Sequence, residues 1–179
     1  MSVYTSQTRS LPTVTYSFLS ASGNNAAWEH SRYSNKECSF TSNAYHLQSF
    51  VFGSKSYFCY GDPNTPFDNF VYTVKAVVSA GDGSLILFRA GPEFQDFFRF
   101  EIHTDGTYSY FRGSSHGNGT SASINRGHNA SNLLGVVAQG TDVALFCNGT
   151  ILTVVVDTVS ASGRIGVGAE WTLRLFVAA

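Results

Sequence analysis

The sequence predicts an all-β fold in which antiparallel strands form a β-sandwich. Three observations lead to this prediction: charged residues make up only 13% of the 179 residues, aromatic residues make up 15%, and short apolar segments alternate with turn signals along the chain. An average domain has about 25% charged residues, and a helical bundle places many of them on its exposed faces. The remaining composition, rich in Ser, Thr, Phe, Tyr and Val, favours strands.

The chain length fits one domain preceded by a short extension. Val14, Tyr16 and Phe18 alternate with polar residues, which predicts a strand with one apolar face. We expect residues 1–21 to form this N-terminal strand-like extension and residues 22–179 to form the β-sandwich domain.

Strand and turn signals follow one another regularly through the domain. Asn148–Gly149 is typical of a type I′ hairpin turn, and Thr104–Asp105–Gly106 is a second hairpin signal. The polar segment Gly113–Asn132 is the longest expected loop, and a short helical turn fits near Asn24–His30. The expected strands are Tyr45–Phe52, Ser56–Tyr60, Phe70–Ser79, Ser84–Arg89, Asp96–His103, Thr107–Arg112, Leu133–Gln139, Val143–Cys147, Thr150–Asp157, Arg164–Ala169 and Thr172–Ala178.

The net charge argues against a nucleic-acid partner, and the lengths of the apolar runs argue against a membrane-spanning segment. The net charge is −1, whereas nucleic-acid affinity comes mainly from clustered Lys and Arg. No run of 18 apolar residues occurs, so we expect no membrane insertion. The polar segment Met1–Arg9 is not a signal peptide, but the Ser-, Thr- and Asn-rich composition favours an extracellular or cell-surface location.

An ordered series of short features gives the chain a family resemblance. The features are Cys38–Ser39–Phe40, Ala44–Tyr45–His46, Tyr57–Phe58–Cys59, Phe67–Asp68–Asn69–Phe70, Gly81–Asp82, Phe97–Phe98–Arg99–Phe100, Asp105–Gly106–Thr107–Tyr108, the segment Asn132–Gly140, Asn148–Gly149 and Gly163–Arg164–Ile165–Gly166–Val167. Their order resembles the concanavalin A-like lectin/glucanase domains, in the laminin-G-like and keto-disaccharide-hydrolase-like branch found in ectodomains of bacterial membrane-anchored kinases. The resemblance implies a jelly roll of two curved antiparallel sheets that binds glycans on its concave sheet or rim loops.

The resemblance also implies a disulfide between Cys38 and Cys59. Such a bridge would close a loop of roughly 20 residues and stabilise the fold by about 3 kcal/mol. Cys147 lies in an apolar run, which predicts a buried strand thiol. No CxxC or CxxH pair occurs and the five histidines lack metal-ligand spacing, so we expect no metal and no cofactor.

The carboxylate pattern argues against a hydrolase. The laminarinase-type branch of the family carries Glu-x-Asp-x-x-Glu on one strand, whereas Glu101 lies in Phe100–Glu101–Ile102–His103–Thr104 without the partner carboxylates of that pattern. Glycoside hydrolysis needs two carboxylates flanking the bond. We therefore expect a protein that is not an enzyme.

The strand Asp96–His103 carries the strongest candidate ligand site. Alternation places Arg99, Glu101 and His103 on one face, and a concave face of this kind offers planar hydrogen-bonding groups to a sugar. The alternative is a solvated sheet face with cross-strand ion pairs.

Three further residues are candidates for the same groove. Arg89 and Tyr108 are expected to join it from neighbouring strands. Trp28 follows a polar run and is placed either at the rim of the groove or in the core.

Two functions remain open at this point. The first is a non-catalytic carbohydrate- or surface-binding module whose partner is a glycan or cell-surface polysaccharide. The second is a self-assembling structural subunit of a fibre, coat or virion surface, which would form a homo-oligomer or filament by exchange of the N-terminal strand.

Overall fold

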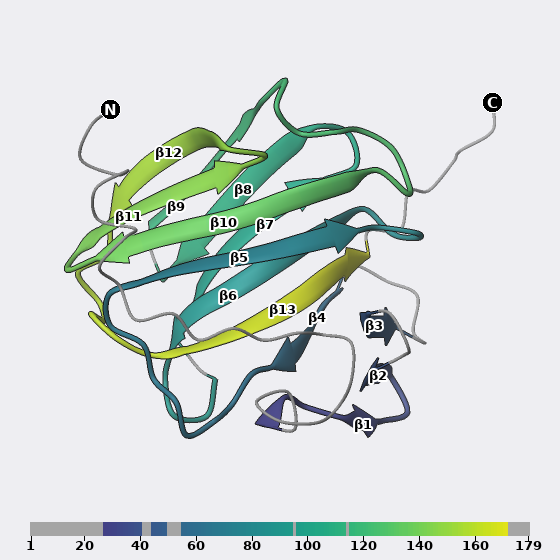
Figure 1. The fold of residues 1–179 in the computed structure, drawn as a ribbon, viewed down its shortest axis with the longest axis horizontal. Helices are drawn as coiled ribbons and strands as arrows, with labels where there is room; N and C mark the ends of the chain where they lie inside the picture. Colours follow the sequence, from purple (N-terminus) through teal and green to yellow (C-terminus); the bar gives the residue numbers. More distant parts are fainter. Residues whose placement is uncertain (1–26, 41–43, 50–54, 95, 114, 172–179) are drawn as a thin grey trace.

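The protein is an antiparallel β-sandwich, as the sequence predicts (Figure 1). The structure, a computed structural model, describes residues 27–40, 44–49, 55–94, 96–113 and 115–171. Thirteen strands form three antiparallel sheets within these ranges. No helix in the described ranges has the length and apolar character needed to cross a membrane.

Two larger sheets lie one behind the other and a small third sheet lies beside them (Figure 1). The four-stranded sheet has the order β12 (Thr150–Val156), β11 (Asp142–Cys147), β10 (Ser131–Gln139) and β5 (Phe70–Val77). The six-stranded sheet has the order β4 (Lys55–Tyr60), β13 (Arg164–Trp171), β6 (Gly83–Ala90), β7 (Phe98–His103), β8 (Thr107–Arg112) and β9 (Ser115–Thr120). The small sheet consists of β1 (Ser31–Arg32), β2 (Lys36–Phe40) and β3 (Tyr45–Ser49).

The core fills the space between the two larger sheets. Phe98 and Phe100 on β7 alternate inward, as predicted, and are 1% and 0% exposed. Phe98 stacks on Phe88 of β6 with ring centroids 4.6 Å apart, and Leu134 and Leu145 face them from the four-stranded sheet. Each such side chain contributes about 1.5–3 kcal/mol through burial, so this aromatic layer holds the sheets together.

The hairpin between β11 and β12 turns at Asn148–Gly149, as predicted. Both residues have positive φ, 50° and 81°, which a type I′ turn requires. The Asn148 side chain reinforces the turn, because its Oδ1 accepts from the Leu133 amide at 2.8 Å. The turn therefore ties β10 to the β11–β12 hairpin.

The segment predicted to be the longest loop contains a strand, β9. Its sequence lacks apolar residues, but Gly117 and Gly119 make room for aromatic rings of the neighbouring strand. A Cβ added at Gly117 would lie 2.6 Å from the Tyr110 ring, and one at Gly119 would lie 2.8 Å from the Tyr108 ring. In β9, glycine therefore allows pairing with β8 and does not end the strand.

Several predicted elements lie outside the described residues. They are the extension over residues 1–21, the C-terminal strand over residues 172–178, the first three residues (24–26) of the helical turn expected near Asn24–His30, and the end of the strand over residues 50–52. The strands β1 and β2 were not predicted, since their polar sequence has no clear alternation.

The disulfide between Cys38 and Cys59 is present, which confirms the pairing that the resemblance implied. It joins β2 in the small sheet to β4 at the edge of the six-stranded sheet. Cys147 is fully buried, as predicted. Its burial raises the pKa of its thiol to about 11, so this cysteine is a packing residue.

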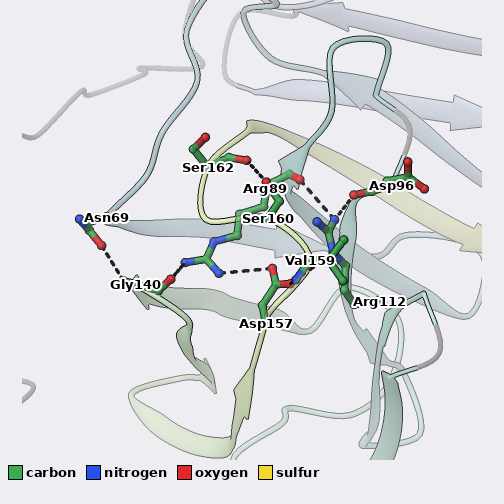
Figure 2. A network of polar contacts seen from close by, with 9 residues as sticks. All are labelled: Asn69, Arg89, Asp96, Arg112, Gly140, Asp157, Val159, Ser160 and Ser162. Atoms are coloured by element: carbon green, nitrogen blue, oxygen red, sulfur yellow. Dashed lines mark hydrogen bonds and ion pairs between the residues drawn. The ribbon is translucent and has the colours of Figure 1, made fainter.

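A buried charge network joins the two sheets at one end of the sandwich (Figure 2). Asp157, just after β12, lies 3.3 Å from Nη1 of Arg89 on β6 and 3.5 Å from Nε of Arg112 on β8. All three side chains are at most 3% exposed. Arg89 also donates to the carbonyl of Gly140 in the β10–β11 turn, and Arg112 donates to the carbonyl of Asp96.

The network corrects the prediction that Arg89 lines a ligand groove. Regular alternation would place Arg89 on the outer face with Leu87. Instead Arg89 has a φ of 50°, and the register between β6 and β13 shifts between Arg164 and Gly166. This bulge turns the Arg89 side chain into the interior, where Asp157 neutralises it.

Replacing Asp157 with Asn is expected to lower the free energy of unfolding by about 3–5 kcal/mol, because it leaves two buried guanidinium groups without their counter-ion. Urea unfolding followed by tryptophan fluorescence measures the change. The matched control is Asp142→Asn on the exposed end of β11, with an expected change within about 0.5 kcal/mol. Equal effects of the two substitutions would contradict the role assigned to the network.

Candidate functional site on the concave face of the six-stranded sheet

The outer face of the six-stranded sheet carries the residues that alternation predicted to lie together. Arg99, Glu101 and His103 pair in register with Leu87, Leu85 and Gly83 on β6. Paired residues point to the same face of a sheet. The predicted trio therefore shares one face, opposite the Phe98 and Phe100 side chains that enter the core.

This face is concave. Arg99 lies on β7 and Ser56 on β4, three strands away, yet Arg99 Nη1 donates to Ser56 Oγ at 3.3 Å. In a flat sheet, three strand spacings amount to about 14 Å, so the sheet must curve toward this face to bring the two groups together. Leu85 and Leu87 on the intervening strand are 2% and 0% exposed, which shows that the side chains around them exclude water.

A polar cluster forms the middle of the concave face and consists of Arg99, Glu101, His103, Ser109 and Glu170. Glu101 lies at its base, where one carboxylate oxygen is 2.8 Å from Arg99 Nε and the other accepts from Ser109 Oγ at 2.8 Å. His103 Nδ1 lies 3.2 Å from Glu170 Oε2. The Arg99, His103 and Glu170 side chains remain 29%, 21% and 23% exposed, so a ligand can reach them.

The electrostatics of the cluster act mainly on Glu170. Burial raises the pKa of Glu170 above its ordinary value, and the negative charge of Glu101 raises it further. His103 and Arg99 oppose this shift. Glu170 therefore takes up a proton more readily than an exposed glutamate, and it can present either a donor or an acceptor as the pH changes.

Aromatic rings flank the polar cluster on the same face. Phe111 on β8 pairs in register with Arg99, is 44% exposed, and lies under the Arg99 guanidinium at 5.8 Å from its ring centroid. Phe58 on β4 packs edge-on against Phe97, which directly precedes β7, at 5.3 Å. The concave face thus combines an exposed ring with fixed hydrogen-bonding groups.

Two other predicted site residues lie away from this face. Tyr108 pairs with Ile102, so it points into the core, where its hydroxyl donates to the Leu152 carbonyl at 3.2 Å. Trp28 is 2% exposed and belongs to the core cluster, with its ring edge-on to Tyr45 at 5.6 Å. Of the two positions expected for Trp28, the structure shows the one in the core and not the one at the rim of the groove.

Glu101, His103 and Glu170 also have the donor atoms for a metal ion. Their candidate ligand atoms lie within 4.8 Å of one another. However, both Glu101 oxygens already contact Arg99 or Ser109, and a cation would meet the Arg99 guanidinium. The donor set therefore fits a hydrogen-bonding site better than a metal centre.

The sequence alone did not identify Glu170, Ser109 or Phe111. The alternation Gly166, Gly168, Glu170 was a usable signal, because it extends the predicted strand past Ala169 and puts a carboxylate on its glycine-bearing face. This alternation does not show which strands are neighbours in the sheet. The contact between Glu170 and His103 could therefore not be predicted.

The comparisons with known proteins identify the fold. No protein-family model and no curated protein matches the chain. Among solved structures, the carbohydrate-binding module CBM66 from Bacillus subtilis matches with a TM-score of 0.60 at 13% identity, over 82% of this chain and 92% of that one. The Crh5 transglycosylase matches with a TM-score of 0.62 at 11% identity, over 88% and 68%.

A third structure, a protein of unknown function with a galectin-like fold from Bacillus subtilis, matches with a TM-score of 0.56 at 12% identity, over 76% of this chain and 80% of that one. These similarities show that the chain has a concanavalin A-like jelly-roll fold, as the resemblance implied. At such low sequence identity the similarities show the fold alone and assign no role to any residue.

The raised pKa of Glu170 predicts a specific dependence of stability on pH. Above the ordinary value of 4.5, folded Glu170 keeps a proton that the unfolded chain has lost. The stability of the wild type relative to Glu170→Gln should therefore fall as pH rises from 4.5 through the raised pKa. Urea unfolding of both proteins at a series of pH values measures this difference.

The control for this series is Glu93→Gln, an exposed carboxylate outside the cluster. The two differences from the wild type are compared over the same range of pH. A Glu170→Gln difference that is flat, or that changes in the opposite direction, would show that the cluster does not hold the Glu170 proton.

Proposed function

We propose that this protein is a non-catalytic carbohydrate-binding module that uses the concave face of its six-stranded sheet. One observation carries the proposal: the exposed Phe111 ring lies beside a cluster of planar hydrogen-bonding side chains on a concave surface. An aromatic ring packs against the apolar face of a sugar, while fixed polar groups satisfy its hydroxyls.

Each exposed member of the cluster has a distinct part in the proposed recognition. The Arg99 guanidinium is held by Glu101, Ser56 and the Phe111 ring, so its free N–H groups are oriented before a ligand arrives. Glu170 and His103 offer an acceptor and a donor next to it. Such preorganisation lowers the entropy lost on binding.

The arrangement of the carboxylates supports a binding role rather than hydrolysis. A glycoside hydrolase needs one carboxylate that protonates the leaving oxygen and a second that attacks or activates water. The Glu101 side chain is 3% exposed, and both of its oxygens are engaged by Arg99 and Ser109. In this role Glu101 orients its neighbours and does not reach a substrate.

The proposed location is extracellular or at the cell surface. The Cys38–Cys59 disulfide supports it, because disulfides persist in oxidising compartments and are rare in the cytosol. Polysaccharides at cell surfaces are the ligands that such a location makes available.

Truncating the ring or the guanidinium should weaken glycan binding. After a glycan array has identified a ligand, Phe111→Ala and Arg99→Gln are each expected to weaken its binding about tenfold in titration calorimetry. Phe111→Tyr keeps the ring and should retain the affinity. Incubation of the glycan with the wild type should release no reducing ends.

The control for these variants is Ile151→Ala, an exposed side chain on the other sheet. If Ile151→Ala weakens binding as much as Phe111→Ala does, the ligand does not bind the concave face. An array with no glycan ligand would contradict the proposed function as a whole.

A second candidate function, self-assembly, has support from the outer face of the four-stranded sheet. Val71, Val137, Ala144 and Val154 form a cross-strand row on it, and Val154 is 51% exposed. Extended exposed apolar surface is common at protein interfaces. The exchange of the N-terminal strand falls outside the described residues and stays a prediction.

Sedimentation velocity over a range of protein concentrations tests this candidate. Self-assembly predicts that the wild type forms larger species as concentration rises and that Val154→Lys remains monomeric. A wild type that is monomeric at every concentration would contradict it.

A further inference from the structure

A pocket lies at the rim of the six-stranded sheet, where the turn between β1 and β2 meets the end of β4 and the β6–β7 loop. Its volume is about 510 Å³, within the range of roughly 300–1,000 Å³ that is typical of small-molecule sites. The lining residues are Ala27, Glu29, Tyr33, Asn35, Lys36, Tyr60, Gly61, Pro63 and Phe94. We call it the rim pocket.

Three aromatic side chains form the walls of the rim pocket. Tyr60 and Phe94 stack with ring centroids 4.0 Å apart and planes 26° apart, and Tyr33 across from them is 52% exposed. Phe94 has a φ of 53°, a left-handed conformation that is rare for a bulky residue. Backbone outliers of this kind cluster at ligand sites, and here the outlier belongs to the residue whose ring stacks on Tyr60.

An ion pair fixes the polar part of the pocket. Lys36 Nζ lies 2.8 Å from Glu29 Oε1 and donates to the Phe58 carbonyl at 2.6 Å. The same ammonium lies 5.3 Å and 5.2 Å from the ring centroids of Tyr33 and Tyr60, so it holds both rings in place. An ammonium has three N–H donors, and two of them are used by these contacts within the described residues.

The charge of the pocket defines the class of ligand. Among the described residues that line the pocket, Glu29 and Lys36 are the charged ones, and they neutralise each other with side chains 14% and 16% exposed. Arg164 lies 5.7 Å from the Phe94 ring centroid but is not a lining residue, and it donates to the Pro63 and Gly91 carbonyls. An anionic ligand would meet the Glu29 carboxylate, and a cationic one would compete with Lys36 for the tyrosine rings. A neutral ring with an apolar face and several hydroxyl groups meets neither obstacle.

We propose that the rim pocket is a second saccharide subsite, which takes a neutral sugar ring against Tyr33 and Tyr60. The free Lys36 donor and the exposed Asn35 amide, both at the pocket, bind hydroxyl groups of that ring. The proposal deepens the proposed function and rests on it, because the pocket continues the same surface.

The register of the sheet connects the rim pocket to the polar cluster. Tyr60, Gly166, Leu87 and Arg99 form one row across four strands. The pocket at one end of this row and the cluster at the other lie up to about 14 Å apart across the sheet. An oligosaccharide with one ring in the pocket and another at the cluster would use both regions, so we expect it to bind more tightly than a single ring.

Titration calorimetry with neutral glucan, mannan and galactan oligosaccharides of increasing length tests this subsite. The intact chain is compared with Tyr33→Ala, Tyr33→Phe and the matched control Ile151→Ala. We expect longer oligosaccharides to bind more tightly than disaccharides, Tyr33→Ala to weaken the longer ligands about tenfold, and Ile151→Ala to bind as the wild type does. Tyr33→Phe keeps the ring and should bind more tightly than Tyr33→Ala. Unchanged urea midpoints show that Tyr33→Ala remains folded.

The outcomes separate this proposal from the proposed function. If Phe111→Ala and Arg99→Gln weaken binding but Tyr33→Ala does not, the rim subsite is wrong and the concave-face function remains. If only Tyr33→Ala weakens binding, the rim subsite remains and the concave-face function is wrong. If no oligosaccharide binds, both are wrong.

Discussion

The buried ion pair between Arg89 and Asp157 is the contact that joins the two larger sheets at the point where β6 leaves regular alternation. It holds Arg89 inside the sandwich, at the residue where the backbone of β6 leaves regular alternation. The associated register shift against β13 sets Gly166 opposite Leu87 and Glu170 opposite Gly83. A slip of one residue reverses the facing of every side chain on a strand. Beyond the bulge, β13 and β6 pair regularly from Gly166–Leu87 to Glu170–Gly83, which keeps Glu170 on the same face as His103.

The concave face and the rim pocket share one arrangement, in which the cation of an ion pair lies against aromatic rings. In the polar cluster, Glu101 holds the Arg99 guanidinium over Phe111. In the rim pocket, Glu29 holds the Lys36 ammonium between Tyr33 and Tyr60. Both acidic partners are largely buried, whereas the rings remain reachable.

The sequence allowed the fold and part of the site to be predicted, since both depend on local alternation. Arg99, Glu101 and His103 occupy alternate positions of one regular strand, and the structure places them on one face. Arg89 was misplaced because alternation fails at a bulge, and neither this bulge nor the distant counter-ion Asp157 leaves a local signal in the sequence. The rim pocket assembles from segments far apart in the sequence, so Tyr33, Tyr60 and Phe94 could not be brought together by spacing alone.

The central claim is that the concave face of the six-stranded sheet is the ligand surface, and mapping by nuclear magnetic resonance tests it most directly. A neutral oligosaccharide identified by the array is titrated into nitrogen-15-labelled protein, and the amide shifts are followed. The account predicts the largest changes in β7, β8 and β13, around Arg99, Ser109 and Glu170. Changes confined to β5, β10, β11 and β12 would place the ligand on the opposite sheet and contradict the claim.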